Sequence, residues 1–270
     1  AVFSGNNGLW ASNEKNLSRT YSSTSTDNGK SWGKVTDITD QVYNGVYGEG
    51  TRYGLFTGSG SGIQLKHGSH AGRLMLVVAA RNDATWGGTM SNYAIYSDDG
   101  GITWKASQNA ACTNGDEAKV VELSNGNILM SIRNRAKEHR LFSLSTDGGE
   151  TWSEPKLNTT ILDPACNGDI IAYTYKGKNL LLHSLPASKT TRENVTVYVS
   201  EDNGETWVPK RCIYKGYSAY SSLQVLDDGT IGIIVEEGKW DGNLPGEDGF
   251  NLGYYRFNLA WLMEGDQDVF

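Results

Sequence analysis

Short apolar and β-branched runs recur along the whole chain, separated by turns that contain glycine, asparagine or aspartate. The pattern is clearest in four segments, each with an apolar strand, a glycine-containing turn and a second apolar strand. These segments cover residues 60–81, 115–134, 167–185 and 220–238. Such runs are typical of paired strands, and no segment has a helical period of convincing length. The pattern therefore predicts an all-β fold.

A second pattern, Ser-x-Asp-x-Gly-x-(Ser/Thr)-Trp, occurs four times. Its copies cover residues 25–32, 97–104, 145–152 and 200–207. Asp and Asn side chains bond to backbone amides two residues on, and Gly supplies positive φ, so each copy is expected to form a hairpin tip. We expect the closing tryptophans to pack back over these turns as structural residues. They are Trp32, Trp104, Trp152 and Trp207.

The strand pairs and hairpins combine into a larger repeat. The first three pairs each precede a hairpin, and the aspartates at 99, 147 and 202 are 48 and 55 residues apart. A repeat of four strands at this spacing is the blade of a β-propeller, whereas a β-sandwich would not explain it. The 72 residues between Asp27 and Asp99 leave room for a loop over residues 41–56. We predict a single domain over residues 1–270.

Composition excludes several classes of partner. The net charge of −7, with no basic stripe, argues against nucleic acid. No apolar run reaches the length of a membrane span. Cys112, Cys166 and Cys212 have no CxxC spacing, so neither a disulfide scaffold nor a zinc site is indicated, and we expect small buried side chains.

Four polar residues lie near the starts of predicted inner strands, where propellers bind ligands, and Tyr220 opens the strand at 220–226. They are Glu117, Arg133, Arg192 and Tyr220. Each one alone has a structural explanation, such as a surface ion pair or a partly buried aromatic ring. Their occurrence at comparable places in successive repeats indicates a site.

The four hairpin motifs, together with `GDEAKVVELSNGNILMSIRN` (115–134) and `YSAYSSLQVLDDGTIGIIVEEG` (217–238), resemble the exo-α-sialidase (neuraminidase) family of bacterial and animal type. The resemblance covers nearly the whole chain. `GYYRFNLAWL` (253–262) also looks like the strand with which those propellers end. The resemblance implies a six-bladed β-propeller.

The resemblance also implies roles for five residues. Tyr220 matches the nucleophile, Glu117 its base, and Arg133 and Arg192 match two of three arginines that bind the substrate carboxylate. Glu236 matches the acid that braces the remaining arginine. The chemistry fits, because the carboxylate of sialic acid repels an Asp or Glu nucleophile but not a neutral phenol. A phenol with a pKa of about 10 needs a neighbouring base.

The expected activity is release of terminal sialic acid from glycoconjugates with retention, with no metal or organic cofactor. Two alternatives stay open, namely transfer of sialic acid by the same residues and glycan binding without catalysis. Trp86 is a candidate for a rim residue that packs on the sugar, and Asp83 is a weaker candidate in the same loop. Each also has a structural explanation as an ordinary loop residue.

The sequence departs from the family at its beginning. It has no Arg-Ile-Pro segment, and the residues ahead of the first hairpin motif contain no Asp, with Glu14 as their only carboxylate. The first arginine and the general acid are therefore unassigned. We expect the chain to be the C-terminal major part of a propeller whose opening blade lies in an N-terminal segment. We expect a secreted, periplasmic or cell-surface protein.

Overall fold

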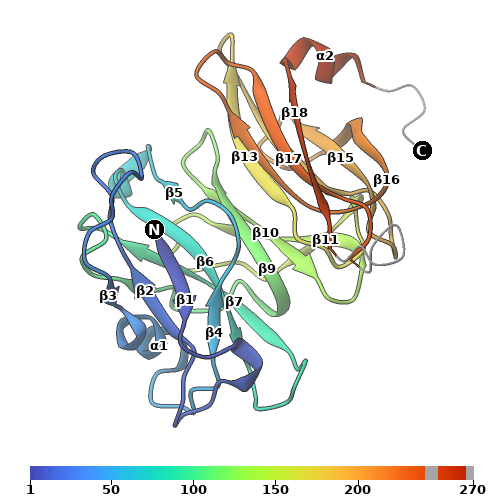
Figure 1. The fold of residues 1–270 in the computed structure, drawn as a ribbon. Coiled ribbons are helices and arrows are strands. Elements are labelled where there is room, and N and C mark those ends of the chain that lie inside the picture. Colours follow the sequence, from blue (N-terminus) through green and yellow to red (C-terminus); the bar gives the residue numbers. More distant parts are fainter. Residues whose placement is uncertain (241–248, 266–270) are drawn as a thin grey trace. The chain divides into compact units, whose positions relative to one another are not determined.

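The computed structural model describes residues 1–240 and 249–265. The chain divides into two compact units, which are described separately (Figure 1). Unit 1 consists of residues 1–130 and 143–155, and unit 2 of residues 131–142 and 156–270. The prediction of one domain over residues 1–270 stays a prediction.

Unit 1 is built mainly from antiparallel strands. Its first sheet has the order β1 (Val2–Gly5), β2 (Arg19–Ser22) and β3 (Thr36–Asp37). Four further strands are neighbours in the order β9 (Cys112–Glu122), β7 (Met90–Ser97), β6 (Leu74–Arg81) and β4 (Leu55–Thr57). The short strands β5 (Ile63–Gln64) and β8 (Lys105–Ala106) pair with β6 and β7. The pairing of β5 with β6 confirms the strand pair predicted at residues 60–81.

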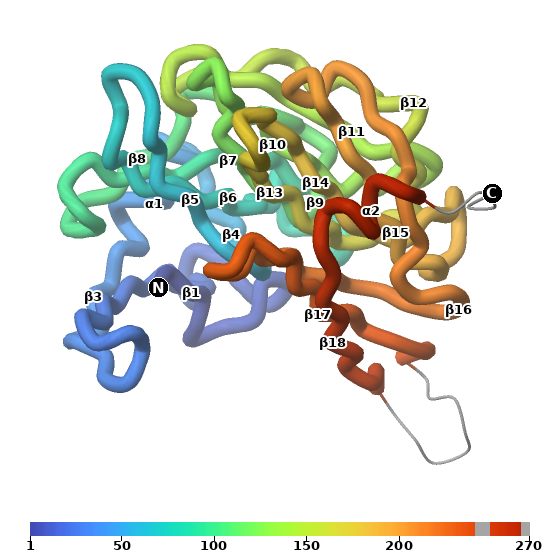
Figure 2. Tube along the Cα trace, turned by 90° about the horizontal axis from the view of Figure 1, so that it is seen from above, coloured from blue at the N-terminus to red at the C-terminus, as the bar shows by residue number. Residues whose placement is uncertain are grey.

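Unit 2 contains a six-stranded antiparallel sheet in which every strand pairs with the next one along the chain. The order is β13 (Asp169–Tyr175), β14 (Lys178–Pro186), β15 (Glu193–Ser200), β16 (Val208–Val225), β17 (Ile231–Glu237) and β18 (Asn251–Phe257). This order confirms the predicted pairs at 167–185 and 220–238. Figure 2 shows β17 and β18 side by side. In the register of this pair, Ile234 lies opposite Tyr254. The remaining strands are β10 (Ile128–Asn134), β11 (Glu138–Ser145) and β12 (Lys156–Asp163), of which β11 and β12 are antiparallel partners.

Strand β16 is longer than the sequence indicated. Its first part pairs with β15 up to Tyr217, and its second part pairs with β17 from Ser218 onward. Tyr220 therefore lies inside a continuous strand, just after the change of partner, rather than at a strand start. Alternating apolar residues of β15, among them Val195, Val197 and Val199, bury one face of this sheet. β-Branched side chains pack well on such a half-buried surface.

Two helices contradict the expectation of a chain without helical segments. Helix α1 (Thr39–Tyr47) lies partly in the predicted loop at 41–56, with Val42 and Tyr43 fully buried. Its apolar pattern covers little more than two turns and includes Gly45. A Cβ added at Gly45 would lie 2.7 Å from the Ala106 Cβ. A glycine normally weakens a helix, so this short pattern was easy to miss.

The second helix, α2 (Leu259–Glu264), follows β18 directly. The side chain of Asn258 caps it by accepting a hydrogen bond from the Trp261 N–H. The strand expected at 253–262 is therefore right as far as Phe257 and wrong beyond it.

The four repeated hairpins share one hydrogen-bond pattern. In the third, the Ser145 hydroxyl donates to Asp147 at 2.8 Å and accepts from the Gly149 N–H at 2.8 Å. The Asp147 carboxylate accepts the Thr151 N–H at 2.9 Å and also the Thr151 hydroxyl. The hairpin tips are confirmed, but the aspartate binds the residue four positions on rather than two.

The closing tryptophans do not all behave alike. Trp104, Trp152 and Trp207 are buried, as predicted, whereas Trp32 is 55% exposed, so the prediction is wrong for the first hairpin. The three buried residues each contact an earlier part of the chain.

These contacts repeat from one hairpin to the next. The backbone N–H of Trp104 donates to the Gln41 side-chain oxygen at 2.7 Å, and the backbone N–H of Trp152 donates to the Asn109 side-chain oxygen at 3.0 Å. The Trp207 ring stacks on Phe142 with the ring centres 5.7 Å apart. A buried motif tryptophan therefore depends on a segment that precedes it in the sequence.

Replacing Ser145 with alanine should lower the free energy of unfolding by about 1–2 kcal/mol, because the buried Gly149 N–H loses its acceptor. The matched control is Ser25→Ala in the first hairpin, where the equivalent Gly29 N–H is exposed and water replaces the hydroxyl. Urea denaturation measures both changes. Equal effects of the two substitutions would contradict the expectation.

Candidate active site

A local break in strand pairing sets the position of Tyr220. Ser218 lies opposite Glu237 and Ser221 opposite Val235, so β16 takes three steps where β17 takes two. The extra residue makes a β-bulge, a feature that re-aims side chains beside functional sites. The Tyr220 N–H donates to Glu236 Oε2 at 3.0 Å, so this carboxylate satisfies a backbone group inside the bulge.

Two guanidinium groups lie at the Tyr220 side chain. Arg133, near the end of β10, donates from Nη1 to the Tyr220 hydroxyl oxygen at 3.2 Å. The guanidinium carbon of Arg192 lies 5.6 Å from the centre of the Tyr220 ring. Both groups stay charged at any ordinary pH. The arrangement therefore presents a hydroxyl beside two fixed positive charges, which suits a planar anion such as a carboxylate.

A backbone carbonyl in the chain segment after β12 holds Arg192. Its Nη2 donates to the carbonyl oxygen of Ala165 at 3.2 Å. The next residue, Cys166, is fully buried, and burial raises the pKa of its thiol to about 12, although Arg192 and Arg133 act against this rise. Cys166 is therefore a neutral side chain beneath the arginines, which leaves their positive charge available to a ligand.

Glu236 makes a contact that its expected role does not include. The resemblance implied that it braces an arginine, whereas among the described residues its carboxylate is hydrogen-bonded to the Tyr220 N–H. Glu236 is thus placed to fix the backbone of the candidate nucleophile. Its part in holding a further arginine stays a prediction.

Glu117 belongs to unit 1, where it lies on β9 and is largely buried. The Ser59 hydroxyl contacts Glu117 Oε1 at 3.5 Å. Lys119, two residues on and therefore on the same face of the strand, lies against Gly60. Gly60 has a φ of +109°, and a Cβ there would lie 2.7 Å from Lys119 Nζ, so glycine is required at this position.

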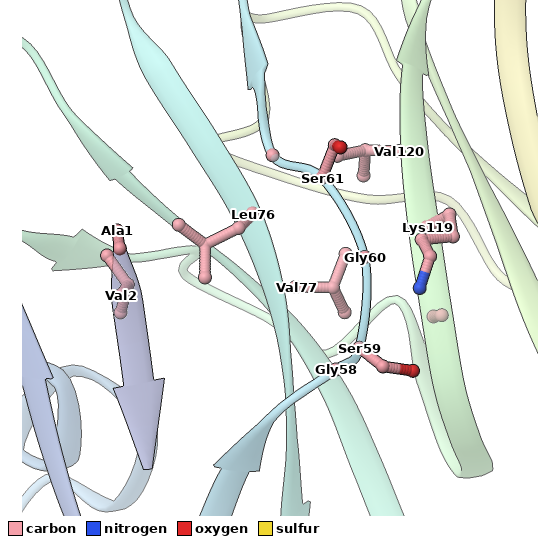
Figure 3. A pocket seen from close by; sticks show the side chains of 12 residues that line it. Ala1, Val2, Gly58, Ser59, Gly60, Ser61, Leu76, Val77, Lys119 and Val120 are labelled. Atoms are coloured by element: carbon pink, nitrogen blue, oxygen red, sulfur yellow. The ribbon is translucent and has the colours of Figure 1, made fainter. Parts of the chain in front are cut away.

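The loop at 58–62 and the face of β9 line a pocket of about 360 Å³. Figure 3 shows the Lys119 amine directed toward Ser59 and Gly60 of this loop. The Glu117 carboxylate and the Lys119 amine therefore lie on the same face of β9. The contact expected between Glu117 and Tyr220 joins the two units and stays a prediction.

Asp83 and Trp86 lie in the unit 1 loop between β6 and β7. Trp86 is 75% exposed, and its ring centre is 5.9 Å from that of Trp10. Asp83 accepts the Thr85 N–H at 2.7 Å, and this hydrogen bond lowers the pKa of the Asp83 carboxyl. Asp83 shapes the loop, while Trp86 is free to meet a ligand at the surface.

The structure thus brings together Tyr220, Arg133, Arg192 and Glu236 in unit 2. It places Glu117, Asp83 and Trp86 in unit 1. Among residues 1–240 and 249–265, no group of three or more His, Cys, Asp or Glu side chains could hold a metal ion. Within the same ranges, no helix has both the length and the apolar character to cross a membrane.

Sequence reasoning missed the support behind the arginines, which comes from Asp163 and Ala165. Both lie in `DPACNGD` (163–169), a turn-rich segment. The one available signal was its Asp-Pro dipeptide, which favours a turn. Nothing in the local sequence indicated that a carbonyl in this turn would hold an arginine.

Comparison with known proteins identifies the family. The model of the BNR repeat-like domain matches residues 4–233. A sialidase from Micromonospora viridifaciens is 36% identical over an alignment of 247 positions that covers 88% of this chain and 35% of that protein. A sialidase from Bacteroides fragilis is 33% identical over an alignment of 221 positions that covers 78% of this chain and 38% of that protein.

Solved structures agree with this assignment. The Hadza microbial sialidase Hz136 superposes with a TM-score of 0.76 at 25% identity, over 96% of this chain and 48% of that one. The intramolecular trans-sialidase from Ruminococcus gnavus, solved with oseltamivir carboxylate, gives a TM-score of 0.73 at 26% identity, over 92% and 52%.

This chain belongs to the exo-α-sialidase (neuraminidase) family with BNR, or Asp-box, repeats, and it has the sialidase type of β-propeller fold. The predicted family and fold class are confirmed. The chain spans 35% and 38% of the two sialidases above, and about half of the two solved structures.

Replacing Glu236 with alanine should expose the Tyr220 N–H in the bulge and lower the free energy of unfolding by about 1 kcal/mol. Glu236→Gln is the matched control, because its amide oxygen can still accept this hydrogen bond. Hydrogen exchange of the Tyr220 amide should be faster in the alanine variant alone. Equal exchange in the wild type and both variants would show that the carboxylate does not hold the bulge.

Proposed function

We propose that the protein releases terminal sialic acid from glycoconjugates. The observation that carries the proposal is the cluster in unit 2, where one tyrosine hydroxyl lies beside Arg133 and Arg192. Membership of a family whose matched relatives are sialidases supports the same reaction. Because the chain spans only part of those relatives, the activity of the whole protein belongs to this proposal.

The two arginines bind the carboxylate that sialic acid carries on its anomeric carbon. Guanidinium groups make paired, charge-assisted hydrogen bonds to carboxylates. The ligand named for the Ruminococcus gnavus structure is itself a carboxylate, which is consistent with this chemistry. The neutral thiol of Cys166 adds no negative charge beneath the pair.

Tyr220 acts as the nucleophile. Its oxygen forms a bond to the anomeric carbon as the glycosidic C–O bond breaks, Glu117 accepts the phenolic proton, and an acid protonates the departing sugar oxygen. Water then attacks the same carbon as its bond to the Tyr220 oxygen breaks. The deprotonated acid takes a proton from this water, and Glu117 returns its proton to Tyr220. Two displacements at one carbon give net retention. No residue of this chain is assigned as the acid.

An N-terminal segment of the same protein completes the propeller and supplies the missing arginine and acid. The exposed Trp32 supports this part of the proposal, because its three equivalents are buried against segments that precede them. A preceding blade would cover Trp32 in the same way. The share of the relatives that this chain spans leaves room for such a segment.

Transfer of sialic acid is the second candidate function. The similarity to the intramolecular trans-sialidase of Ruminococcus gnavus favours it, and the same tyrosine and arginines would serve. Product analysis with and without an added galactoside separates hydrolysis from transfer between molecules. A glycan-binding protein without catalysis would give no released sialic acid under either condition.

Replacing Tyr220 with phenylalanine in the full-length protein should abolish turnover of a fluorogenic sialoside, because the substitution removes the attacking oxygen and little else. Folding should be intact by circular dichroism. Tyr254→Phe is the matched control, since this tyrosine of β18 is 61% exposed and should not affect the rate. Wild-type activity in Tyr220→Phe would exclude Tyr220 as the nucleophile.

Replacing Arg192 with alanine should weaken binding of sialic acid by about 2–5 kcal/mol, because one of two guanidinium groups facing the carboxylate is lost. Isothermal titration calorimetry measures the change. Arg256→Ala is the control, since Arg256 is half exposed and pairs with Asp228. If both variants bind as the wild type does, the carboxylate is held elsewhere.

A further inference from the structure

A fully buried ion pair lies behind the two arginines of unit 2. Arg140 Nη1 and Asp163 Oδ2 are 3.0 Å apart, and both side chains are 0% exposed. Burying two charges costs more than their attraction returns unless further hydrogen bonds satisfy them, so such a pair is weak evidence for a role in stability. The contacts of the pair indicate a different role.

The Asp163 carboxylate accepts two backbone N–H groups. Its Oδ2 accepts from Asn134 and its Oδ1 from Cys166, both at 3.0 Å. The first N–H belongs to the peptide that directly follows Arg133. The second belongs to the peptide that directly follows Ala165. The Asp163 carboxylate therefore holds the peptide that follows Arg133 and the peptide whose carbonyl accepts from Arg192.

The second of these peptides also contains the carbonyl that binds Arg192. A trans peptide is planar and its N–H and C=O point in opposite directions, so fixing one end fixes the other. Asp163 holds the N–H end, and Arg192 donates to the Ala165 oxygen at the other end at 3.2 Å. Asp163 therefore fixes the position of the Arg192 guanidinium through the planar peptide between Ala165 and Cys166.

Arg140 also holds β10 in place, through Ser131. Its Nε donates to the Ser131 hydroxyl at 2.9 Å, and Nη1 also donates to the Cys166 carbonyl at 2.8 Å. Ser131 lies two residues before Arg133, on the same face of the strand. The strand is therefore held on both sides of Arg133, at residue 131 by Arg140 and at residue 134 by Asp163.

A neutral histidine completes this group. His183 Nε2 lies 2.6 Å from the Ser131 hydroxyl, and the ring is fully buried. Burial, together with the charge of Arg140, holds the pKa of His183 well below its ordinary value. The histidine thus adds no positive charge that would repel Arg140 or compete with it for Asp163.

Ala165 adopts a backbone conformation that residues with a Cβ rarely adopt. Its φ is +61°, in the left-handed region that side chains with a Cβ disfavour. Such strain is found where the surroundings over-determine the backbone, often at functional sites. Here the conformation directs the Ala165 carbonyl at Arg192.

We propose that Asp163 is a positioning residue for carboxylate recognition: with Arg140, it fixes the placement of Arg133 and Arg192 relative to one another and does not touch the substrate. This inference rests on the proposed function, because it takes the two arginines to be the carboxylate site. It goes beyond that function by assigning the geometry of the site to a buried group behind it.

The test compares binding of N-acetylneuraminic acid and of its methyl ester by isothermal titration calorimetry. The ester has no charged carboxylate, so the ratio of the two affinities reports on recognition of the carboxylate. Asp163→Asn removes the charge and replaces one acceptor oxygen with a donor. We expect it to weaken binding of the acid about tenfold or more and to change binding of the ester less than about twofold.

Ile231→Val is the matched control. Ile231 is fully buried in the core of unit 2, where it pairs with Val225, the last residue of β16. The substitution should destabilise the protein without changing the ratio of the two affinities. If Asp163→Asn keeps the wild-type ratio as Ile231→Val does, the proposal is overturned. If the wild type itself does not prefer the acid, the proposed function fails, which is a different result.

Ala165→Gly provides a second test of the proposal in case Asp163→Asn does not fold. Glycine adopts a positive φ without strain, so this variant should be at least as stable as the wild type. Its looser carbonyl should nevertheless weaken binding of the acid about threefold and leave the ester unaffected. Opposite changes in stability and acid binding support a positioning role. Unchanged acid binding in this variant would contradict it.

Discussion

Two guanidinium groups held at one phenol are the constraint on which the rest of unit 2 depends. Like charges repel, and this repulsion is largest where water is excluded. The protein meets the constraint with backbone rather than with flexible side chains. A bulge in β16 aims Tyr220, the end of β10 carries Arg133, and a left-handed residue presents its carbonyl to Arg192. Hydrogen bonds to main-chain groups hold each of these elements in place.

The repeated hairpins solve a separate problem, which is how successive strand pairs are joined. Each tip satisfies its own backbone amides through a serine and an aspartate, and in three of the four the tryptophan is buried. These residues carry no chemistry in the proposed reaction. Their role is to shape the turns between strands.

Much of the fold could be predicted from the sequence because strand periodicity and turn chemistry are local. Helix α1 was missed because its apolar pattern spans only nine residues and includes Gly45. The exposure of Trp32 was missed because burial depends on a covering segment, which no local pattern encodes. The resemblance indicated Tyr220, Arg133 and Arg192. It did not indicate Asp163, whose contact with the Asn134 N–H joins residues 29 positions apart and left no local signal in the sequence.

The sequential order of the sheet in unit 2 has a consequence for how the protein folds. Every strand from β13 to β18 pairs with its neighbour in the chain, so most of the sheet can form by successive hairpins with small loss of loop entropy. The contact between Arg133 and Tyr220 joins residues 87 positions apart and cannot form until those hairpins exist. Recognition of an anion is therefore acquired late in folding, and a partly folded chain would have its strands but not its specificity.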